Sequence, residues 1–114
     1  MIDIVLVEDN QELATLMKDL LIQKGFSVCH FKSGEAFLKW LSQKENTPKM
    51  IILDVMLPLI DGFFVCQEIR KKGNIPILMM SAKTGKSNQL LGFELGADDY
   101  LEKPIDLDIL IAKI

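Results

Sequence analysis

The chain has 114 residues, 49% of them hydrophobic and 25% charged, with a net charge of −3 and a pI near 5.1. This length predicts one domain with a buried core, and the acidic balance argues against a nucleic-acid-binding surface on this segment. No apolar run approaches the roughly 18 residues that cross a bilayer, and no signal peptide precedes the first strand, so we expect a cytoplasmic protein without membrane contact.

The first half of the chain reads as strand, helix, strand, helix. The apolar run 2–7 predicts a strand. After the N-cap residue Asn10, apolar residues recur at helical spacing until Gly25 ends the helix. That helix face consists of Leu13, Leu16, Met17, Leu20 and Leu21. A second strand is predicted over 26–31, and Ser33 caps a second helix.

The second half continues the alternation. Further strands are predicted over 50–54, 75–81 and 98–102, with helices over 62–70, in a segment ending at Gly96, and after Lys103-Pro104. Continuous apolar runs are typical of strands that are covered on both faces. Five strand–helix units therefore predict an α/β fold, a flavodoxin-like (βα)5 doubly wound parallel sheet of five strands in the order 2-1-3-4-5.

Polar side chains follow four of the predicted strands. Glu8 and Asp9 follow the first, Asp54 ends the third, Ser81 ends the fourth and Lys103 follows the fifth. Such folds place their functional crevice at the carboxyl ends of the strands, so these side chains should converge. Close carboxylates repel one another unless a cation is present, and hard oxygen ligands suit Mg²⁺. With a lysine charge and a hydroxyl nearby, the set fits a phosphoryl group carried on an aspartate.

Four segments resemble the receiver domain of two-component response regulators. They are LVEDN (6–10), LDVMLPLIDGF (53–63), MMSAK (79–83) and LGFELGADDYLEKPIDLD (91–108). The resemblance spans essentially the whole chain, and ELGADDYLEKP is most similar to the class with a winged-helix DNA-binding domain downstream. It implies a receiver domain over 1–114 with a truncated fifth helix and an absent effector domain, through which alone DNA would be contacted.

The resemblance also implies roles for the residues of the site. Asp54 is the phosphoacceptor, and Ser81 and Lys103 bind the phosphoryl oxygens. The Mg²⁺ ligands are Glu8, Asp9, Asp54 and the backbone carbonyl of Met56. In this family, the residues two after the phosphoacceptor and two after the hydroxyl flank the path of the hydrolytic water. Here they are Met56 and Lys83, and we expect slow self-dephosphorylation because methionine cannot activate water.

Further roles concern switching and partners. Ser81 and Tyr100 are the implied switch residues, and the bond before Pro104 is expected to be cis. A cognate histidine kinase supplies the phosphoryl group, and a phosphorylation-dependent homodimer forms through the fourth helix, fifth strand and fifth helix. Asp99 and Lys113 occupy the positions of one charged pair across that interface. A second such pair is missing, because Gln89 and Ile109 stand at its positions.

Three other functions fit the pattern less well. A phosphatase of the haloacid dehalogenase type needs a second aspartate two residues after the nucleophile, where this chain has Met56. A flavodoxin-like FMN binder needs a phosphate-binding first loop, but VEDNQE (7–12) offers carboxylates. A constitutive interaction module would not need the full phosphorylation set.

Some residues keep simpler interpretations. Taken alone, Tyr100 is also consistent with a core residue and Ser81 with a turn residue. No second histidine is present to pair with His30, so it is assigned no role. Cys29 and Cys66 lack a metal or redox spacing and are expected to be free thiols.

Overall fold

Strands and helices alternate along the whole chain, as predicted. The computed structural model describes residues 2–43, 45–83 and 85–114. The strands are β1 (Ile4–Val7), β2 (Val28–Phe31), β3 (Met50–Asp54), β4 (Ile77–Ser81) and β5 (Asp99–Glu102). The helices are α1 (Gln11–Gln23), α2 (Gly34–Leu41), α3 (Gly62–Arg70), α4 (Lys86–Glu94) and α5 (Leu107–Ala112).

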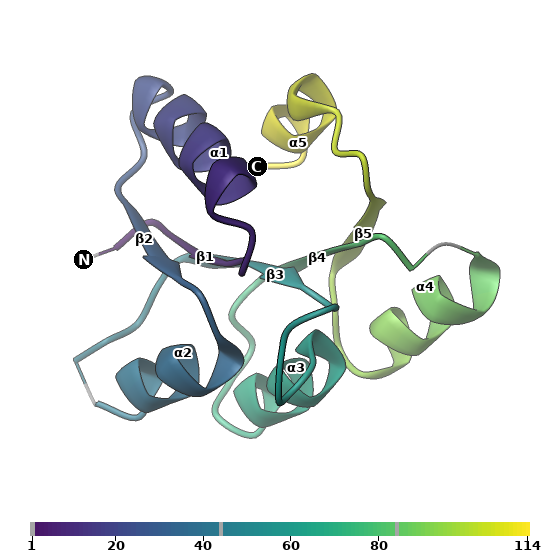
Figure 1. The fold of residues 1–114 in the computed structure, drawn as a ribbon. Coiled ribbons are helices and arrows are strands. Elements are labelled where there is room, and N and C mark those ends of the chain that lie inside the picture. The colour runs from purple at the N-terminus through teal and green to yellow at the C-terminus, as the bar shows by residue number, and fades with distance from the viewer. Residues whose placement is uncertain (1, 44, 84) are drawn as a thin grey trace.

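The five strands form one parallel sheet in the order β2-β1-β3-β4-β5. Figure 1 shows α1 and α5 on one face of the sheet and α2, α3 and α4 on the other. The predicted fold class and strand order are confirmed. Because all strands run the same way, their carboxyl ends lie at one edge of the sheet, and this edge carries the polar residues singled out above.

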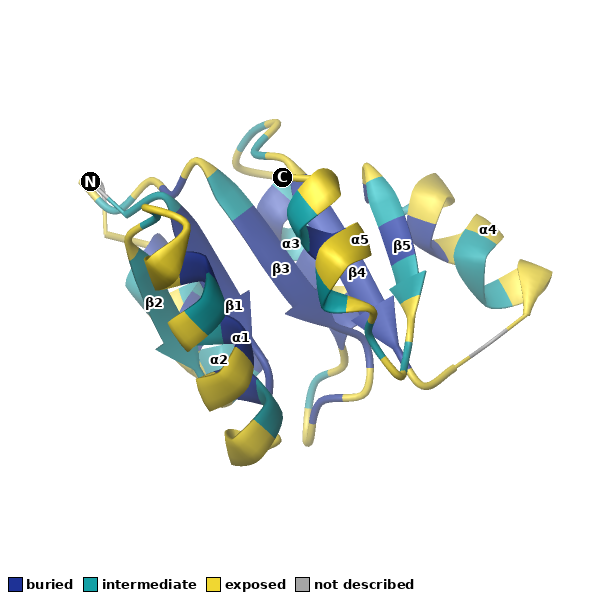
Figure 2. Ribbon diagram, turned by 90° about the horizontal axis from the view of Figure 1, so that it is seen from above, coloured by how far each residue is buried: buried dark blue, intermediate teal, exposed yellow. Residues whose placement is uncertain are grey.

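The core consists of two apolar layers, one on each face of the sheet. Every residue of β1 and β4 is buried, as are four of the five residues of β3. Figure 2 shows this burial as dark blue central strands, with the teal strand β2 on one side and the mixed colours of β5 on the other. Strands covered on both sides cannot alternate polar and apolar residues, which explains their continuous apolar sequences.

The first turns of α1 and α2 are capped by the side chains that the sequence predicted as N-caps. The Asn10 Oδ1 accepts a hydrogen bond from the Leu13 N–H, and the Ser33 Oγ accepts one from the Ala36 N–H. Such caps satisfy backbone donors that have no partner within the helix. Gly25 follows the end of α1 with φ +96°, a conformation that favours glycine.

The buried stripe of α1 is narrower than predicted. Ala14, Met17 and Leu21 are buried, but Leu16 is 55% exposed, so its assignment to the core face was wrong. The buried residues follow one another at spacings of three and four, which keeps them on one line along the helix. Leu16 lies beside that line and faces solvent.

Both cysteines are free thiols, as expected. Cys66 is buried in the layer of α2 and α3, where burial raises the pKa of its thiol. None of the helices in the described ranges combines the length and the apolar character needed to cross a bilayer.

Candidate functional site

The polar residues predicted to converge do meet at the carboxyl edge of the sheet. Glu8 and Asp9 follow β1, Asp54 ends β3, Ser81 ends β4 and Lys103 follows β5. Carboxylate oxygens of Glu8, Asp9 and Asp54 lie within 4.8 Å of one another. The parallel order β1-β3-β4-β5 places these ends side by side, although they are up to 95 residues apart in the sequence.

Asp54 is 1% exposed and has partners for both carboxylate oxygens. Its Oδ2 lies 3.0 Å from the Lys103 Nζ, and its Oδ1 accepts the Met56 N–H at 3.1 Å. The start of α3 packs closely behind it: a Cβ added to Gly62 would lie 2.2 Å from the Asp54 backbone oxygen. Glycine at position 62 therefore allows α3 to begin directly beside the site.

Glu8 is fully buried, and its polar groups are all engaged. Its Oε1 lies 2.7 Å from the Lys103 Nζ, and its Oε2 accepts the Asn10 N–H at 3.0 Å. Its backbone N–H donates to the Phe31 oxygen at 3.0 Å, and its backbone oxygen lies 2.7 Å from the His30 Nε2. This engagement explains how a carboxylate can be buried at the end of β1.

Lys103 is the positive charge among these carboxylates. Burial lowers the pKa of its ammonium, but the hydrogen bonds to Glu8 and Asp54 outweigh burial and leave the pKa above its ordinary value. Lys103 therefore stays charged and bridges the two buried carboxylates. The chain itself thus supplies a cation that reduces the repulsion between these carboxylates.

Asp9 differs from the other two acids because it is exposed. Partial burial of its carboxyl and the neighbouring Glu8 raise its pKa above the ordinary value. Three carboxylates against one ammonium leave negative charge at the edge, and the donors are oxygens. Such a set suits a hard divalent cation, so the cluster is able to bind a metal ion.

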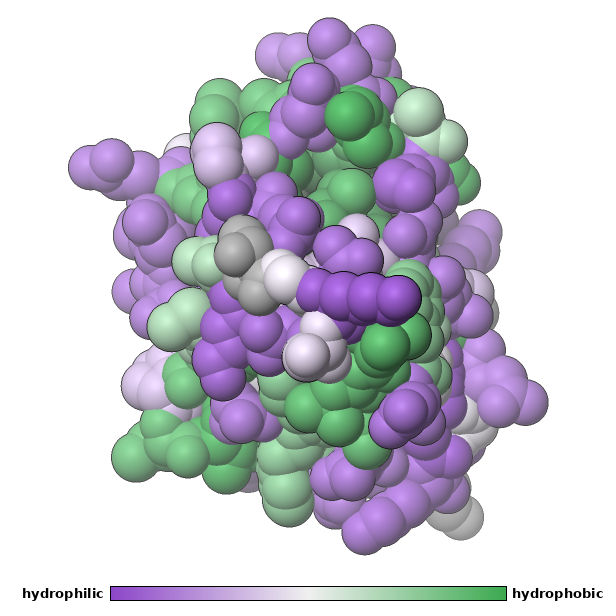
Figure 3. All heavy atoms as spheres, turned by 90° about the vertical axis from the view of Figure 1, so that its right-hand side faces the viewer, coloured by the Kyte–Doolittle hydropathy of each residue, from purple (hydrophilic) through white to green (hydrophobic). Residues whose placement is uncertain are grey.

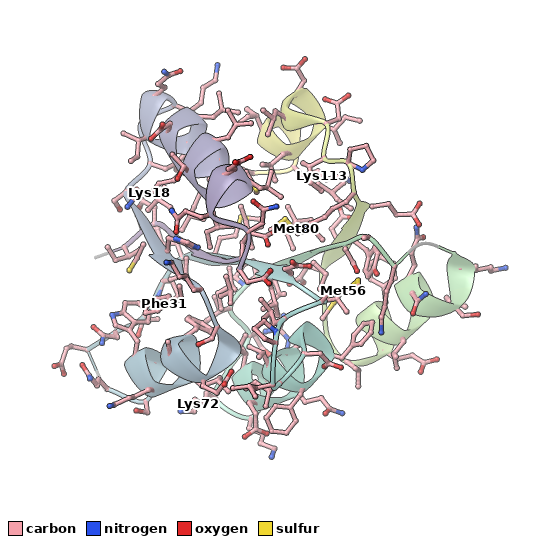
Figure 4. The ribbon with its side chains drawn as sticks, in the orientation of Figure 1. Lys18, Phe31, Met56, Lys72, Met80 and Lys113 are labelled. Atoms are coloured by element: carbon pink, nitrogen blue, oxygen red, sulfur yellow. The ribbon has the colours of Figure 1, made fainter. Side chains whose placement is uncertain are left out.

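Met56 follows Asp54 on the loop that leaves β3, as Figure 4 shows. Its side chain is 51% exposed, and its N–H donates to Asp54. This hydrogen bond holds the Met56 backbone beside the carboxylate cluster. The backbone, not the apolar side chain, is the part available to such a cation.

Ser81 and Tyr100 are linked through the backbone of Lys83. The Ser81 side chain is fully buried, and its Oγ accepts the Lys83 N–H at 2.9 Å. The Tyr100 hydroxyl donates to the Lys83 carbonyl at 3.0 Å. Tyr100 is 7% exposed, and burial raises its pKa, against a smaller opposing effect of a hydrogen bond with Ser81. Core packing alone would not require the contact with Lys83.

The peptide bond between Lys103 and Pro104 is cis, as the resemblance implies. The ammonium of Lys83 lies 5.9 Å from the centre of the Phe63 ring, so its side chain extends across the start of α3. The two flanking positions named above, Met56 and Lys83, therefore both belong to segments that border the site.

Asp99 and Lys113 form an ion pair within the chain. Burial raises the pKa of Asp99, but hydrogen bonds from Lys113 and the Tyr100 N–H outweigh it and lower the pKa below its ordinary value. The pair joins β5 to the end of α5. At the positions of the missing second pair, Gln89 is half-buried and Ile109 is 47% exposed.

Sequence reasoning missed the contact of His30 with Glu8. No motif pointed to it, since a lone histidine in a strand has no characteristic spacing. The only available signal was its position near the carboxyl end of the predicted second strand, next to the end of the first in the predicted strand order.

A doubly wound parallel sheet with clustered carboxylates, a buried serine hydroxyl and a lysine at its carboxyl edge defines a phosphoacceptor signalling domain. The family model described as "Response regulator receiver domain" matches residues 4–114, and the chain belongs to this family. Receiver domains are phosphorylation-dependent switches of two-component systems. They are regulatory domains and not metabolic enzymes. This family assignment sets aside the phosphatase and flavin-binding interpretations.

Curated relatives carry regulatory names. The chain is 40% identical to the transcriptional regulatory protein AfsQ1 of Streptomyces coelicolor over 97% of its own length and 48% of the relative's. It is 39% identical to the response regulator protein GraR of Staphylococcus haemolyticus over 97% of its own length and 49% of the relative's. The chain thus spans about half the length of the curated relatives it matches.

Solved structures share the fold closely. One is the BeF3-activated N-terminal receiver domain of RstA from Klebsiella pneumoniae, with a TM-score of 0.89 and 30% identity. The alignment covers 97% of this chain and 93% of that one.

Proposed function

We propose that this domain accepts a phosphoryl group from a histidine kinase on Asp54 and thereby controls an output, transcription, through a DNA-binding domain downstream. The regulatory names of the relatives support a transcriptional output. The domain would act in the cytoplasm, where its kinase presents the phosphoryl group.

One observation carries the assignment of Asp54. Its carboxylate is the one that meets both the Lys103 ammonium and the Met56 N–H at the meeting point of four strand ends. In the transfer, a carboxylate oxygen of Asp54 attacks phosphorus and forms a P–O bond, while the P–N bond to the donor histidine breaks. Lys103 and the Ser81 hydroxyl then meet the charge of the new phosphoryl oxygens, which amounts to about two negative charges.

Glu8, Asp9, Asp54 and the Met56 carbonyl would hold Mg²⁺. When bound, the ion screens the carboxylates and neutralises charge on the phosphoryl oxygens. The side chains of this cluster supply oxygen donors only, and two of the three carboxylates are already buried and hydrogen-bonded. The residues of the chain therefore fit this ion.

Incubation with acetyl phosphate and Mg²⁺ tests the proposal. The wild type should gain one phosphoryl group that is labile to hydroxylamine, with acetate as the leaving group. Asp54→Asn should gain none, because an amide is not a nucleophile here. The control Asp19→Asn, at an exposed position of α1, should label like the wild type. Labelling of Asp54→Asn at the wild-type rate would disprove the assignment.

The output would pass through the face formed by α4, β5 and α5. The links from Ser81 through the Lys83 backbone to Tyr100 connect the site to this face. The helices of this face carry exposed apolar side chains, which are Leu90, Leu91 and Phe93 on α4 and Ile109 on α5. Figure 3 views the side of the molecule that faces right in Figure 1 and shows apolar areas bordered by polar side chains. This surface supports a weak homodimer, formed on phosphorylation, more than a permanent one.

The phosphoryl group on Asp54 should be lost slowly. Met56 offers no group that orients water, and the Lys83 stem crosses the start of α3 beside the site. Loss of radiolabel after removal of the donor measures the rate. Met56→Asn should accelerate the loss, whereas the exposed control Leu59→Asn should not; a half-life of seconds in the wild type would contradict the expectation.

A further inference from the structure

His30 lies at the carboxyl edge of the sheet, next to last in β2. It is half-buried, and its Nε2 is 2.7 Å from the backbone oxygen of Glu8. A carbonyl oxygen only accepts hydrogen bonds, so the Nε2 must carry the proton and donate. β2 thus supplies two consecutive contacts to Glu8, because the Phe31 oxygen accepts the Glu8 N–H.

The oxygen that His30 contacts belongs to the peptide unit joining Glu8 to Asp9. A peptide unit is planar, so fixing the direction of its oxygen also fixes where the Cα of Asp9 lies. Asp9 itself lies between the end of β1 and the start of α1, outside any helix or strand. Its carboxylate is the exposed member of the acidic cluster, whereas Glu8 and Asp54 are buried.

The two buried carboxylates are placed by direct hydrogen bonds to their side chains. Glu8 has Lys103 and the Asn10 N–H, and Asp54 has Lys103 and the Met56 N–H. The Asp9 carboxylate interacts instead with the neighbouring Glu8 and with its own backbone, so its position depends on how that backbone is held. His30 contacts this backbone unit from a different strand, with its Nε2 2.7 Å from the Glu8 oxygen.

We propose that His30 is a positioning residue for the metal site: by holding the Glu8–Asp9 peptide, it orients the Asp9 carboxylate toward Asp54 and increases the affinity for Mg²⁺. This inference rests on the proposed function, since it assumes Mg²⁺ at the acidic cluster. Groups that orient the ligands of a metal typically change its affinity by about 10–100-fold when removed. For a contact through the backbone, the low end of that range, about 10-fold, is expected.

A purely structural role predicts a different result. If His30 only secured the edge strand β2, its removal would lower thermal stability and leave the affinity of the folded protein for Mg²⁺ unchanged. Val28 offers a matched control, because it lies two residues away on the same face of β2 and packs against the core. Val28→Ala should reduce stability without touching the Glu8–Asp9 peptide.

The test is a titration with MgCl2 at constant ionic strength and fixed pH, followed by the NMR shifts of the Asp9 and Asp54 amides. His30→Leu should bind Mg²⁺ about 10-fold more weakly than the wild type. His30→Gln, which keeps a side-chain N–H donor, should recover most of the loss, and Val28→Ala should bind like the wild type. Melting curves in EDTA report the stability of each variant separately.

Equal Mg²⁺ affinity of His30→Leu and the wild type would overturn the inference while leaving the metal site intact. So would equal weakening in Val28→Ala, which would trace the effect to stability. A wild type that does not bind Mg²⁺ would overturn both the inference and the proposed metal site. If His30→Leu does not fold, His30→Phe keeps a ring of similar size without the donor and carries the same comparison.

Discussion

At the scale of single residues, Lys103 is the counter-charge that allows two carboxylates of the site to be buried. Glu8 and Asp54 are 0% and 1% exposed, and both contact its ammonium. A buried carboxylate without a counter-charge costs several kcal/mol, so the lysine compensates for the burial that the strand ends impose. The same residue is available to a phosphoryl group, which would compete with the two carboxylates for it.

Lys103→Met should therefore lower the free energy of unfolding by about 3 kcal/mol in Mg²⁺-free buffer at pH 7, as expected when one partner of a buried ion pair is removed. The pKa of Lys103 is raised above its ordinary 10.5, so its contribution is fully present below that value and is lost as the pH rises through the raised pKa. Urea unfolding should thus give a constant difference between wild type and variant from about pH 6 to 9 and a smaller one above about pH 10.5.

The exposed lysine of α2 provides the control. Lys39→Met removes a charge of the same kind from an exposed position, where substitutions usually change stability by no more than about 0.5 kcal/mol. If Lys103→Met lowered the free energy of unfolding by no more than about 0.5 kcal/mol, the two carboxylates would not depend on the Lys103 ammonium.

At the scale of elements, α4 and β5 fit together because α4 carries a glycine on its buried side. A Cβ added to Gly92 would lie 3.1 Å from the Tyr100 ring and 3.1 Å from the Met79 sulfur. Glycine inside a helix costs roughly 0.5–1 kcal/mol relative to alanine. The space it leaves is occupied by Tyr100, whose hydroxyl reaches Lys83. The glycine thus lowers the intrinsic stability of α4 but leaves room for the Tyr100 ring in its buried position.

Gly92→Ala should move the Tyr100 ring toward solvent. Because the chain has a single tyrosine, phenolate absorbance reports on this residue alone. Burial raises the pKa of Tyr100 above its ordinary 10.0, so the titration midpoint of the variant should fall toward that value. Ser87→Ala, at an exposed position of α4, should titrate like the wild type. An unchanged midpoint in Gly92→Ala would mean that Lys83 alone holds the ring.

At the scale of the whole molecule, metal binding and folding should be coupled. The acidic cluster joins the ends of β1 and β3, so a cation that binds only the folded chain stabilises it by mass action. At ten times its Kd, Mg²⁺ should add about 1.4 kcal/mol. That corresponds to a rise in Tm of about 5 °C for a domain of this size.

Thermal melts in MgCl2 and in NaCl of equal ionic strength measure this coupling. The rise should appear with Mg²⁺ only and should vanish in Asp9→Ala. The same rise in Asp9→Ala would place the ion elsewhere on the protein.

Assembly is the second property of the whole molecule. Asp99 and Lys113 already pair within the chain, so the same pair between two copies must first replace this contact. Exposed ion pairs contribute only about 0.2–1 kcal/mol each, and lysine lacks the two-pronged geometry of arginine. We therefore expect a monomer without phosphate and a weak, salt-sensitive dimer with beryllofluoride.

Light scattering over a range of protein concentrations tests this, with Asp99→Arg expected to prevent the dimer. The lowered pKa of Asp99 means that the pair is present above its ordinary value of 3.8 and is lost only as the pH falls through the lowered value. Titration of Asp99 should therefore not change dimerisation near neutral pH. A tight dimer without beryllofluoride, or one unaffected by Asp99→Arg, would refute this interface.

The sequence by itself determined the elements, the strand order and the membership of the site. Helical and continuous apolar patterns marked the helices and strands, because burial of one stripe leaves a helical period and burial of both faces leaves an unbroken apolar run. Parallel strands joined by right-handed crossovers allow few topologies. Once the order was known, Glu8, Asp54 and Lys103 had to meet, since each stands at a carboxyl end.

The tertiary structure alone decided which atoms pair. Three contacts depend on the directions of side chains across neighbouring strands and helices. They are the bridge from Lys103 to two carboxylates, the pair of Asp99 with Lys113 inside the chain, and the contact of His30 with the Glu8 carbonyl. The exposure of Leu16 likewise depends on how much of α1 the sheet covers. Residues far apart in the chain leave no local period that encodes such contacts, because packing fixes them only after the strands and helices have assembled.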